Sequence, residues 1–472
     1  MRRSNATTLA AALAAVALTT TACLGAKDDN ADPNRGSGAK DVTLTISANA
    51  IAGGKNAVEA DWVTKYVIPT FTAKLKQDGI NATIKFQPSG VDDEQYKAKL
   101  ALDLKAGGGA DIVSLDGIWV GEFAEAGYLK PLDDVVGGDA VSKWDGWAQI
   151  PPTVQQNMSF TDKRYGVPSG TDGRVLFFNK TLLTRAGLPA DWQPTSWADV
   201  ISAGQKLKAA GVPAPIQINA GTAMGEATTM QGALPLLVGT GKEIYDPDSK
   251  KWQGATSNVK ELLTLYQQIY GAGLGDKTLQ QEAKGRDKSF ADFAAGKIGI
   301  LLESDYFWRS VIEPKAGIAP MKNRDEVVGY AKIPAIRPGA GVRGQDFVSM
   351  SGGGGRSINP NTKFPQQAWQ LLAFMNSAEA TKALLAGSAR LTQRTDVNSE
   401  VLTADPMLDF IAKQVLPLTA YRPGLAVYPQ VSAALQQATA DVVAGKSPDA
   451  AAATYQSTVQ KAVGGNGNVA TS

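Results

Sequence analysis

A regular alternation of strand and helix patterns constrains the fold of this chain more than any other feature of its sequence. Residues 42–46 alternate apolar and polar side chains with the period of two that is typical of a strand, and residues 82–86 and 111–115 form two further strand-like runs. Helix-like stretches at 63–75 and 94–105, with apolar residues four apart, separate these runs. This βαβαβ order predicts a mostly parallel sheet with helices on both faces.

The same alternation continues along the chain, and the last third is mainly helical. We expect Pro69 to kink or interrupt the first helix, because proline lacks the backbone N–H that a helix interior needs. Further strand and helix patterns cover 174–178, 198–210, 215–219, 259–270, 299–302, 366–375, 378–385, 407–414, 430–444 and 449–462. No internal repeat of about 20–50 residues is present, so a solenoid or a propeller is excluded.

The first residues have the composition of a targeting segment. A short basic start, Arg2 and Arg3, precedes an apolar run at Leu9–Leu18 that is too short to span a bilayer as a permanent helix. Small residues then lead to Cys23, the single cysteine of the chain. This ending resembles the bacterial lipoprotein box, with Thr20 where the box usually has an aliphatic residue.

The lipoprotein interpretation predicts a signal peptide over 1–22, acylation of Cys23 and a flexible polar tether over 23–40. The alternative is an ordinary cleaved signal in which the cysteine stands by chance. Several acyl chains on one residue hold a protein stably at a membrane. We therefore expect this protein outside the cytoplasm, lipid-anchored at the outer face of the bacterial cytoplasmic membrane.

The charge balance argues against a nucleic-acid partner. The chain has 47 Lys and Arg against 45 Asp and Glu, and removal of residues 1–22 takes away Arg2 and Arg3 and no acidic residue, so the two counts become equal. A nucleic-acid binder needs a basic excess or a basic stripe. About 430 residues follow the tether, which is enough for two domains with separate cores.

The absence of histidine removes several catalytic chemistries. Ser-His-Asp triads, imidazole bases and His-ligated metals are excluded, and no Walker motif occurs, so we expect no ATP hydrolysis, no metal and no cofactor. The Gly-x-Gly-x-x-Gly string at 339–344 follows prolines and precedes no helix, which predicts a loop. The glycine run at 352–355 indicates a close approach of backbone segments. Glycoside hydrolysis by a carboxylate pair stays open, because 45 acidic residues always supply some pair.

Several motifs carry a family resemblance when they are read together and in order. They are Ala110–Asp116 with Phe123–Asp133, then Tyr165–Pro168 with Phe177–Lys180 and Pro194–Trp197, then Phe293–Ile300 with Ser304–Tyr306, and finally Tyr428–Pro429 with Ala444–Pro448. Over residues 41–464 this order and spacing resembles the extracellular solute-binding proteins of ABC sugar importers, the family that includes maltose-binding protein.

The resemblance implies a two-lobe α/β fold of the periplasmic-binding-protein type, with a hinge and three interlobe crossings. We place these crossings near 153–157, 332–343 and 388–395. The implied division is 41–155 with 344–390 for the N-terminal lobe, 156–331 with 396–464 for the C-terminal lobe, 332–343 and 391–395 for hinge segments, and 465–472 for a disordered tail.

The resemblance also implies a function. Members of the family bind a sugar between their lobes, close on it as a hinge, and are then recognised by the permease. We expect a non-catalytic, monomeric binding component of an ABC importer, with a carbohydrate as ligand and with permease subunits and their cytoplasmic ATPase as partners. The alternatives are a receptor for another polar solute (a polyol, a glycerol phosphate ester or an oligopeptide), a secreted carboxylate-dependent glycosidase, or a structural surface lipoprotein.

Sugar capture favours carboxylates and amides for the hydroxyl groups and aromatic rings for the CH face, placed at strand ends and in loops. Asp172 stands eight residues before Lys180, where the family has a sugar-binding carboxylate, and Tyr306 stands near the family's stacking position. The candidate ligand-binding residues are Asp116, Trp119, Asp172, Asp305, Tyr306, Asn49 and Tyr428.

Structural alternatives accompany three of these candidates: a helix N-cap for Asp116, core packing for Trp119 and a simple turn for Asp172. Arg356 and Arg422 fit either an ion pair or a ligand contact. Residues predicted to serve packing instead are Phe307, Trp308, Trp62, Trp197 and Trp369.

Overall fold

The predicted βαβαβ opening forms the parallel part of a first sheet. The computed structural model describes residues 32–54, 56–91, 93–385 and 389–471. Strands β1 (Asp41–Ala48), β2 (Asn81–Pro88) and β3 (Ile112–Asp116) are parallel, in the order β2-β1-β3. Strands β15 (Gly354–Ile358) and β6 (Val167–Pro168) extend this sheet antiparallel to their neighbours. The sheet is thus mixed, because two strands from later in the chain join it.

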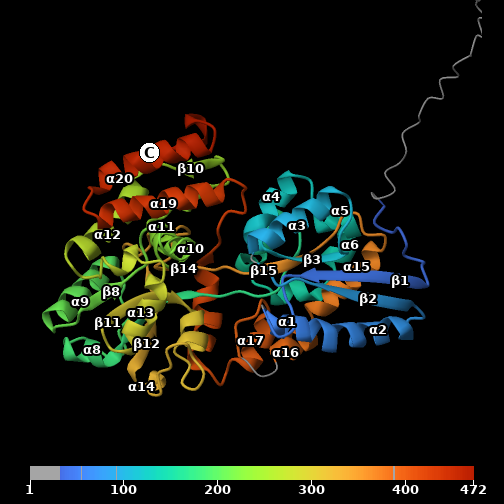
Figure 1. Ribbon diagram of the computed structural model, residues 1–472, viewed down its shortest axis with the longest axis horizontal. Helices are drawn as coiled ribbons and strands as arrows, with labels where there is room; N and C mark the ends of the chain where they lie inside the picture. The colour runs from blue at the N-terminus through green and yellow to red at the C-terminus, as the bar shows by residue number, and fades with distance from the viewer. Residues whose placement is uncertain (1–31, 55, 92, 386–388, 472) are drawn as a thin grey trace, which may run out of the picture.

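Helices cover both faces of this sheet, as predicted, and together they form the first lobe (Figure 1). A π-helical turn, η2 (Val63–Val67), directly precedes the helix that contains Pro69, so the predicted interruption is present. The helices of the lobe are α1 (Ala57–Trp62), α2 (Ile68–Gln77), α3 (Asp93–Lys105), η3 (Gly117–Trp119), α4 (Val120–Glu125), α5 (Leu132–Val136), α6 (Gly138–Ser142), η4 (Asp145–Gln149), α7 (Pro152–Gln155), η5 (Gln156–Met158), α15 (Pro365–Met375) and α16 (Ala378–Leu385), with a hairpin of β4 (Ser159–Phe160) and β5 (Lys163–Arg164).

The second lobe lies beside the first along the long axis of the molecule (Figure 1) and contains three smaller sheets. The first has the order β12-β7-β11-β8, from β12 (Val328–Ala331), β7 (Arg174–Asn179), β11 (Ile298–Ser304) and β8 (Ala214–Gln217). The second joins β13 (Ile333–Pro334), β14 (Phe347–Met350) and β16 (Thr419–Ala420), and the third joins β17 (Val469–Ala470), β10 (Lys251–Gln253) and β9 (Tyr245–Asp246).

In the second lobe the predicted ranges 198–210, 259–270, 407–414, 430–444 and 449–462 are helical, and the structure adds further helices that were not predicted. The helices of this lobe are α8 (Lys180–Arg185), α9 (Trp197–Ala209), α10 (Glu226–Thr228), η6 (Thr229–Ala233), α11 (Leu234–Gly239), α12 (Ser257–Tyr266), η7 (Gln267–Gly271), η8 (Leu279–Gln281), α13 (Gly285–Ala294), η9 (Phe307–Val311), α14 (Arg324–Val327), α18 (Pro406–Phe410), η10 (Ile411–Val415), η11 (Leu416–Leu418), α19 (Tyr428–Val443), α20 (Pro448–Ala462) and η12 (Asn466–Asn468). Helix α17 (Thr395–Val401) lies beside α16 of the first lobe (Figure 1), and Thr395 donates a hydrogen bond to Gln149 there at 3.0 Å.

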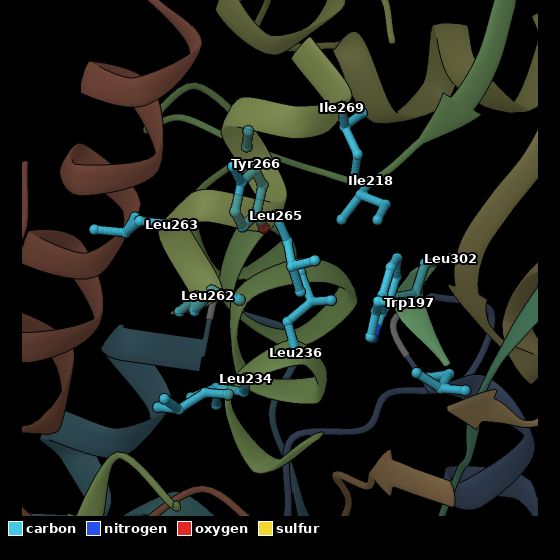
Figure 2. Packing of buried hydrophobic residues seen from close by; sticks show 14 of the residues in the cluster. Trp197, Ile218, Leu234, Leu236, Leu262, Leu263, Leu265, Tyr266, Ile269 and Leu302 are labelled. Atoms are coloured by element: carbon cyan, nitrogen blue, oxygen red, sulfur yellow. The ribbon is translucent and has the colours of Figure 1, made fainter. Parts of the chain in front are cut away.

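The start of α9 shows how local sequence fixes one of these helices. The Ser196 hydroxyl accepts a hydrogen bond from the Asp199 amide at 3.3 Å, and the Asp199 carboxylate accepts one from the Ser196 amide at 3.0 Å. This reciprocal cap satisfies two backbone donors that a helix start leaves free. It fixes the helix start at Trp197, whose fully buried ring packs in the largest apolar core (Figure 2).

Two of the predicted crossings lie elsewhere. The chain leaves the first sheet after β6 and enters the second lobe at β7, so residues 169–173 form the first passage, and it returns at 351–353, between β14 and β15. The predicted segment 153–157 lies inside the first lobe, where Val154 is part of the core. The predicted segment 332–343 packs on the second lobe, because the amides of Ile336 and Val342 donate to carbonyls at the end of α11 at 2.9 Å.

Two flanking segments are also more ordered than expected. Residues 32–40 of the predicted tether lie against the first lobe, where Arg35 donates hydrogen bonds to the carbonyls of Thr362 at 2.7 Å and Pro360 at 2.8 Å. The predicted disordered tail at 465–472 contains η12 and β17, and β17 pairs with β10. The predicted signal peptide, Cys23, residues 24–31 and residue 472 lie outside the described residues.

None of the helices in the described part of the chain combines the length and the hydrophobicity that a membrane span requires.

The two passages between the lobes touch each other through a glycine. Gly353 has φ of +134°, and a Cβ added there would lie 2.7 Å from the carbonyl oxygen of Gly170. We expect Gly353→Ala to lower the free energy of unfolding by about 2–4 kcal/mol, because both the backbone conformation and the close contact exclude a side chain. Urea denaturation followed by Trp fluorescence measures this change.

The matched control for this variant is Gly170→Ala. A Cβ at Gly170 meets no atom within 4 Å and its φ is not positive, so we expect a change below about 0.5 kcal/mol. Equal destabilisation by the two variants would contradict the proposed role of the contact.

Candidate functional site

A polar cavity of about 260 Å³ lies where the two lobes and the two passages meet. The first lobe contributes residues of α1, β15 and α16, and the second lobe contributes residues at the end of β11 and in η9. The lining residues are Glu59, Ser169, Gly170, Thr171, Asp172, Asp305, Arg309, Gly352, Gly353, Gly354, Arg356, Leu384, Arg390 and Leu391. Among these described lining residues none is aromatic, and most are charged or offer polar backbone or hydroxyl groups.

Asp172 connects the two passages at the edge of the cavity. Its carboxylate pairs with Arg174 at the start of β7 and accepts a hydrogen bond from the Gly352 amide at 2.6 Å. Burial alone would raise the pKa of Asp172, but Arg174, the Gly352 amide and the nearby Arg422 outweigh it and hold the pKa below its ordinary value. Asp172 therefore remains an anion that ties the first passage to the second.

Asp305 directly follows the last residue of β11 and lines the cavity. Its carboxylate accepts hydrogen bonds from the Gly173 amide at 3.2 Å and from the Arg309 guanidinium at 2.8 Å. The side chain is 1% exposed, and this burial raises the pKa of Asp305 although Arg309 opposes the shift; the charge of Asp172 raises it further. Both predicted carboxylates thus line one cavity and interact with each other.

Arginine side chains from both lobes face the same space. Arg356, on β15, is 3% exposed and donates a hydrogen bond to Glu59 of α1 at 2.6 Å, while its Nε atom has no hydrogen-bond partner within the described residues. Arg390 has no hydrogen bond or ion pair to any described residue. Burial lowers the pKa of Arg390, and the nearby charges of Arg309 and Arg356 lower it further, while Glu59 opposes them.

A second group of charges lies near the 351–353 passage but does not line the cavity. Arg422, in the segment after β16, donates a hydrogen bond to Glu226 of the second lobe at 3.3 Å and lies 3.9 Å from Asp116 of the first lobe. Asp116 also caps η3 by accepting a hydrogen bond from the Ile118 amide at 3.1 Å. The helix N-cap, which was the structural alternative to a ligand contact for Asp116, is therefore present. Asp116 also makes an ionic contact across the lobes.

The other candidate residues do not line the cavity. Trp119 is 5% exposed and packs against Tyr96 in a core cluster of the first lobe, and Tyr428 is 2% exposed with its hydroxyl donating to Glu226. Asn49 donates to the Val91 carbonyl at 3.1 Å and to Asp93 at 3.0 Å.

The Tyr306 ring is half-buried and faces the guanidinium groups of Arg286 and Arg309, whose carbon atoms lie 5.8 and 5.7 Å from its centroid. It stands next to the cavity without being part of its lining.

Sequence reasoning missed several charged residues of the two groups: Glu59, Glu226, Arg309 and Arg390. Arg309 follows Asp305 by four positions, and this i, i+4 spacing is a local signal for an ion pair. Glu59 lies on a helix and has no such signal. Glu226 and Arg390 follow no periodic pattern that sets them apart from surface residues.

A two-lobed α/β chain with a polar cavity between its lobes is the arrangement of a protein that holds a small solute. The sequence matches the family described as bacterial extracellular solute-binding proteins over residues 54–382. The chain belongs to this family.

The known relatives have low sequence identity to this chain but align with most of its length. A predicted binding protein of Brucella abortus (strain 2308) is 24% identical over 332 residues, which cover 70% of this chain and 74% of that protein. The sugar-binding protein MalE of Xanthomonas citri is similar in structure with a TM-score of 0.71 and 18% identity, covering 90% of this chain and 98% of that one.

A further similar structure is an ABC transporter solute-binding protein of Thermotoga lettingae bound with α-D-tagatose. It has a TM-score of 0.63 and 23% identity and covers 89% of this chain and 99% of that one. These likenesses support the two-lobe fold of the present chain.

The ion pair of Asp172 makes a pH-dependent contribution to stability. Because the pKa of Asp172 is lowered on folding, its charged form stabilises the protein above the ordinary Asp pKa of about 3.9, and this contribution is lost as the pH falls through the native pKa. We expect Asp172→Asn to lower the free energy of unfolding by about 2 kcal/mol near neutral pH, and the difference from the wild type to shrink below about pH 4. Urea titrations at several pH values measure it.

Asp449→Asn serves as the control, since the Asp449 side chain is 79% exposed and pairs with Lys260 at the surface. Exposed pairs contribute little, so we expect a change below about 1 kcal/mol at any pH. A difference for Asp172→Asn that stays constant down to low pH would contradict the assigned charge state.

Proposed function

We propose that this protein is the extracytoplasmic substrate-binding component of an ABC importer, which captures a carbohydrate between its lobes and delivers it unaltered to the permease. The observation that carries the proposal is the polar cavity at the junction of both lobes and both passages. Ligand bound there contacts both lobes at once, so it can favour a closed arrangement to the extent that it binds that arrangement better. Family membership and the sugar-binding proteins among the structural neighbours support the same function.

Within this proposal Asp172 and Asp305 contact the ligand, and the Ser169 and Thr171 hydroxyls with the glycine backbone at 352–354 supply further hydrogen-bonding groups. Carboxylates and hydroxyls suit the fixed hydroxyl directions of a sugar. The cavity of about 260 Å³ is close to the lower end of ligand-pocket volumes, which is about 300 Å³. It therefore fits a single sugar ring or one end of a longer chain.

A glycosidase is the less favoured candidate. Glycoside hydrolysis needs one carboxyl group that donates a proton and a second that acts as base or nucleophile. Here both cavity aspartates are bound by arginines and by backbone amides, which favours a binding role. A binding protein leaves glycosides intact after long incubation, and a released product would identify an enzyme instead.

Ligand binding is tested by thermal unfolding with a panel of mono-, di- and oligosaccharides. A true ligand at 100 times its Kd stabilises the protein by about 2.7 kcal/mol, so the midpoint rises with ligand concentration. We expect Gly170→Trp to weaken binding of that ligand at least about tenfold, because a side chain at this position enters open space in the cavity.

Gly38→Trp is the matched control, since a Cβ at Gly38 also meets no atom within 4 Å but the residue does not line the cavity. It should leave the affinity unchanged. A panel in which no carbohydrate shifts the midpoint would refute the sugar assignment, and unchanged binding by Gly170→Trp would move the site elsewhere.

We also propose that Cys23 is acylated and holds the protein at the outer face of the membrane. Loss of the acylated residue removes the anchor, so Cys23→Ser expressed in a bacterial host should shift the protein from the membrane fraction to the soluble fraction. Metabolic labelling with a radioactive fatty acid should mark the wild type alone. Equal membrane association of the wild type and Cys23→Ser would contradict the anchor. Ser37→Ala, a control outside the predicted signal peptide, should behave as the wild type.

A further inference from the structure

The charged groups that line the cavity leave one arginine without a partner. Glu59 is hydrogen-bonded by Arg356, Asp305 by Arg309, and Asp172 by Arg174, which lies just behind it. Arg390 is the remaining lining arginine, and no described residue forms a hydrogen bond or ion pair with it. The lining thus has three carboxylates and three arginines, but Asp172 is paired from outside the lining, which leaves Arg390 unpaired among the described residues.

The surroundings of Arg390 disfavour its charge in the empty protein. Arg390 is part-buried and stands near Arg309 and Arg356, whose like charges lower its pKa together with burial. Glu59 attracts Arg390, but Glu59 is already hydrogen-bonded by Arg356. A guanidinium withdrawn from water is stable when an anion receives its hydrogen bonds, and a planar carboxylate or phosphate fits its paired donors.

A second buried arginine supplies an independent indication. Arg356 is 3% exposed and its Nε–H has no hydrogen-bond acceptor within the described residues. The Arg356 guanidinium therefore makes fewer hydrogen bonds than its donors allow, and the residue lines the same cavity as Arg390. Arg356 and Arg390 thus both offer unused donors around one space that no described aromatic side chain lines.

We propose that the cavity binds a small solute that carries an anionic group, a carboxylate or a phosphate, on a hydroxyl-bearing body, and that Arg390 is the specificity-determining residue that receives this group. The inference rests on the proposed function and narrows its ligand class to acidic carbohydrates. The hydroxyl groups of the solute face Ser169, Thr171 and the glycine backbone, while its anionic group lies toward Arg390 and Arg356.

Isothermal titration of the mature protein with matched ligands tests this inference. The panel contains glucose and galactose, their uronic acids, their 6-phosphates, glycerol 3-phosphate and inorganic phosphate. We expect one uronic acid or sugar phosphate to bind at least about tenfold more tightly than its neutral parent, since a charge-assisted pair in a sheltered site contributes about 1.4 kcal/mol or more. The uronic acids and the phosphates separate the two anionic groups.

Arg390→Gln should abolish this preference, so that the acid and its neutral parent bind with about equal affinity, because glutamine keeps hydrogen-bonding groups without the charge. Arg337→Gln removes an arginine that is 69% exposed and outside the cavity, and should change neither affinity. Circular dichroism and the unfolding midpoint verify that both variants are folded.

The outcomes separate the inference from the function on which it rests. Neutral sugars that bind as tightly as their acids, or an acid preference that survives in Arg390→Gln, would overturn the anionic ligand and leave the sugar-binding function standing. Binding of glycerol 3-phosphate or inorganic phosphate alone would support the anion site and refute the carbohydrate. Failure of every ligand to bind would reject both.

Discussion

The contact between the two backbone passages is the constraint on which the rest of this structure depends. The Gly353 carbonyl accepts hydrogen bonds from the Gly117 amide at 3.1 Å and from the Asn157 side chain at 2.8 Å, and its Cα faces the Gly170 carbonyl at a distance that leaves no room for a side chain. Asp172 adds a charged tie between the same passages. Strand ends from both lobes therefore meet around one small space, and the cavity is a consequence of this meeting.

The sequence predicted the elements well because side-chain periodicity is a local property. Strands at 42–46 and 111–115 and helices at 198–210 and 430–444 were recognised to within a few residues, and Trp62, Trp197 and Trp369 are buried as expected. The glycine run at 352–355 was interpreted as a close backbone approach. At three of its residues, a Cβ atom added to the glycine would lie within 2.7 Å of a backbone carbonyl oxygen.

The passages were harder to predict, because glycine and proline mark any irregular segment and do not say which sheet the next strand joins. The same limit applies to the site. Asp172 and Asp305, which line the cavity, were selected by the family pattern and by their places next to strands, and strands of parallel and mixed sheets end at a common edge. Trp119, selected after a strand end, and Tyr428, selected from the late segment, are buried in cores, and nothing local distinguishes a ring that faces a cavity from one that packs. Arg390 was missed since its importance comes only from the arginines around it.

The arginines also explain how this protein can be stable and still respond to a solute. Arg422 lies between Asp116 of the first lobe and Glu226 of the second, so a charged contact already joins the lobes outside the cavity. Inside the cavity the pairs of Glu59 with Arg356 and of Asp305 with Arg309 each stay within one lobe. Asp172 belongs to both sets, because it lines the cavity and its carboxylate also accepts the Gly352 hydrogen bond that ties the two passages. A solute that contacts both inner pairs joins the lobes inside the cavity as well. The free energy of closure that it provides is limited to the difference between its binding free energies for the closed and the open arrangement.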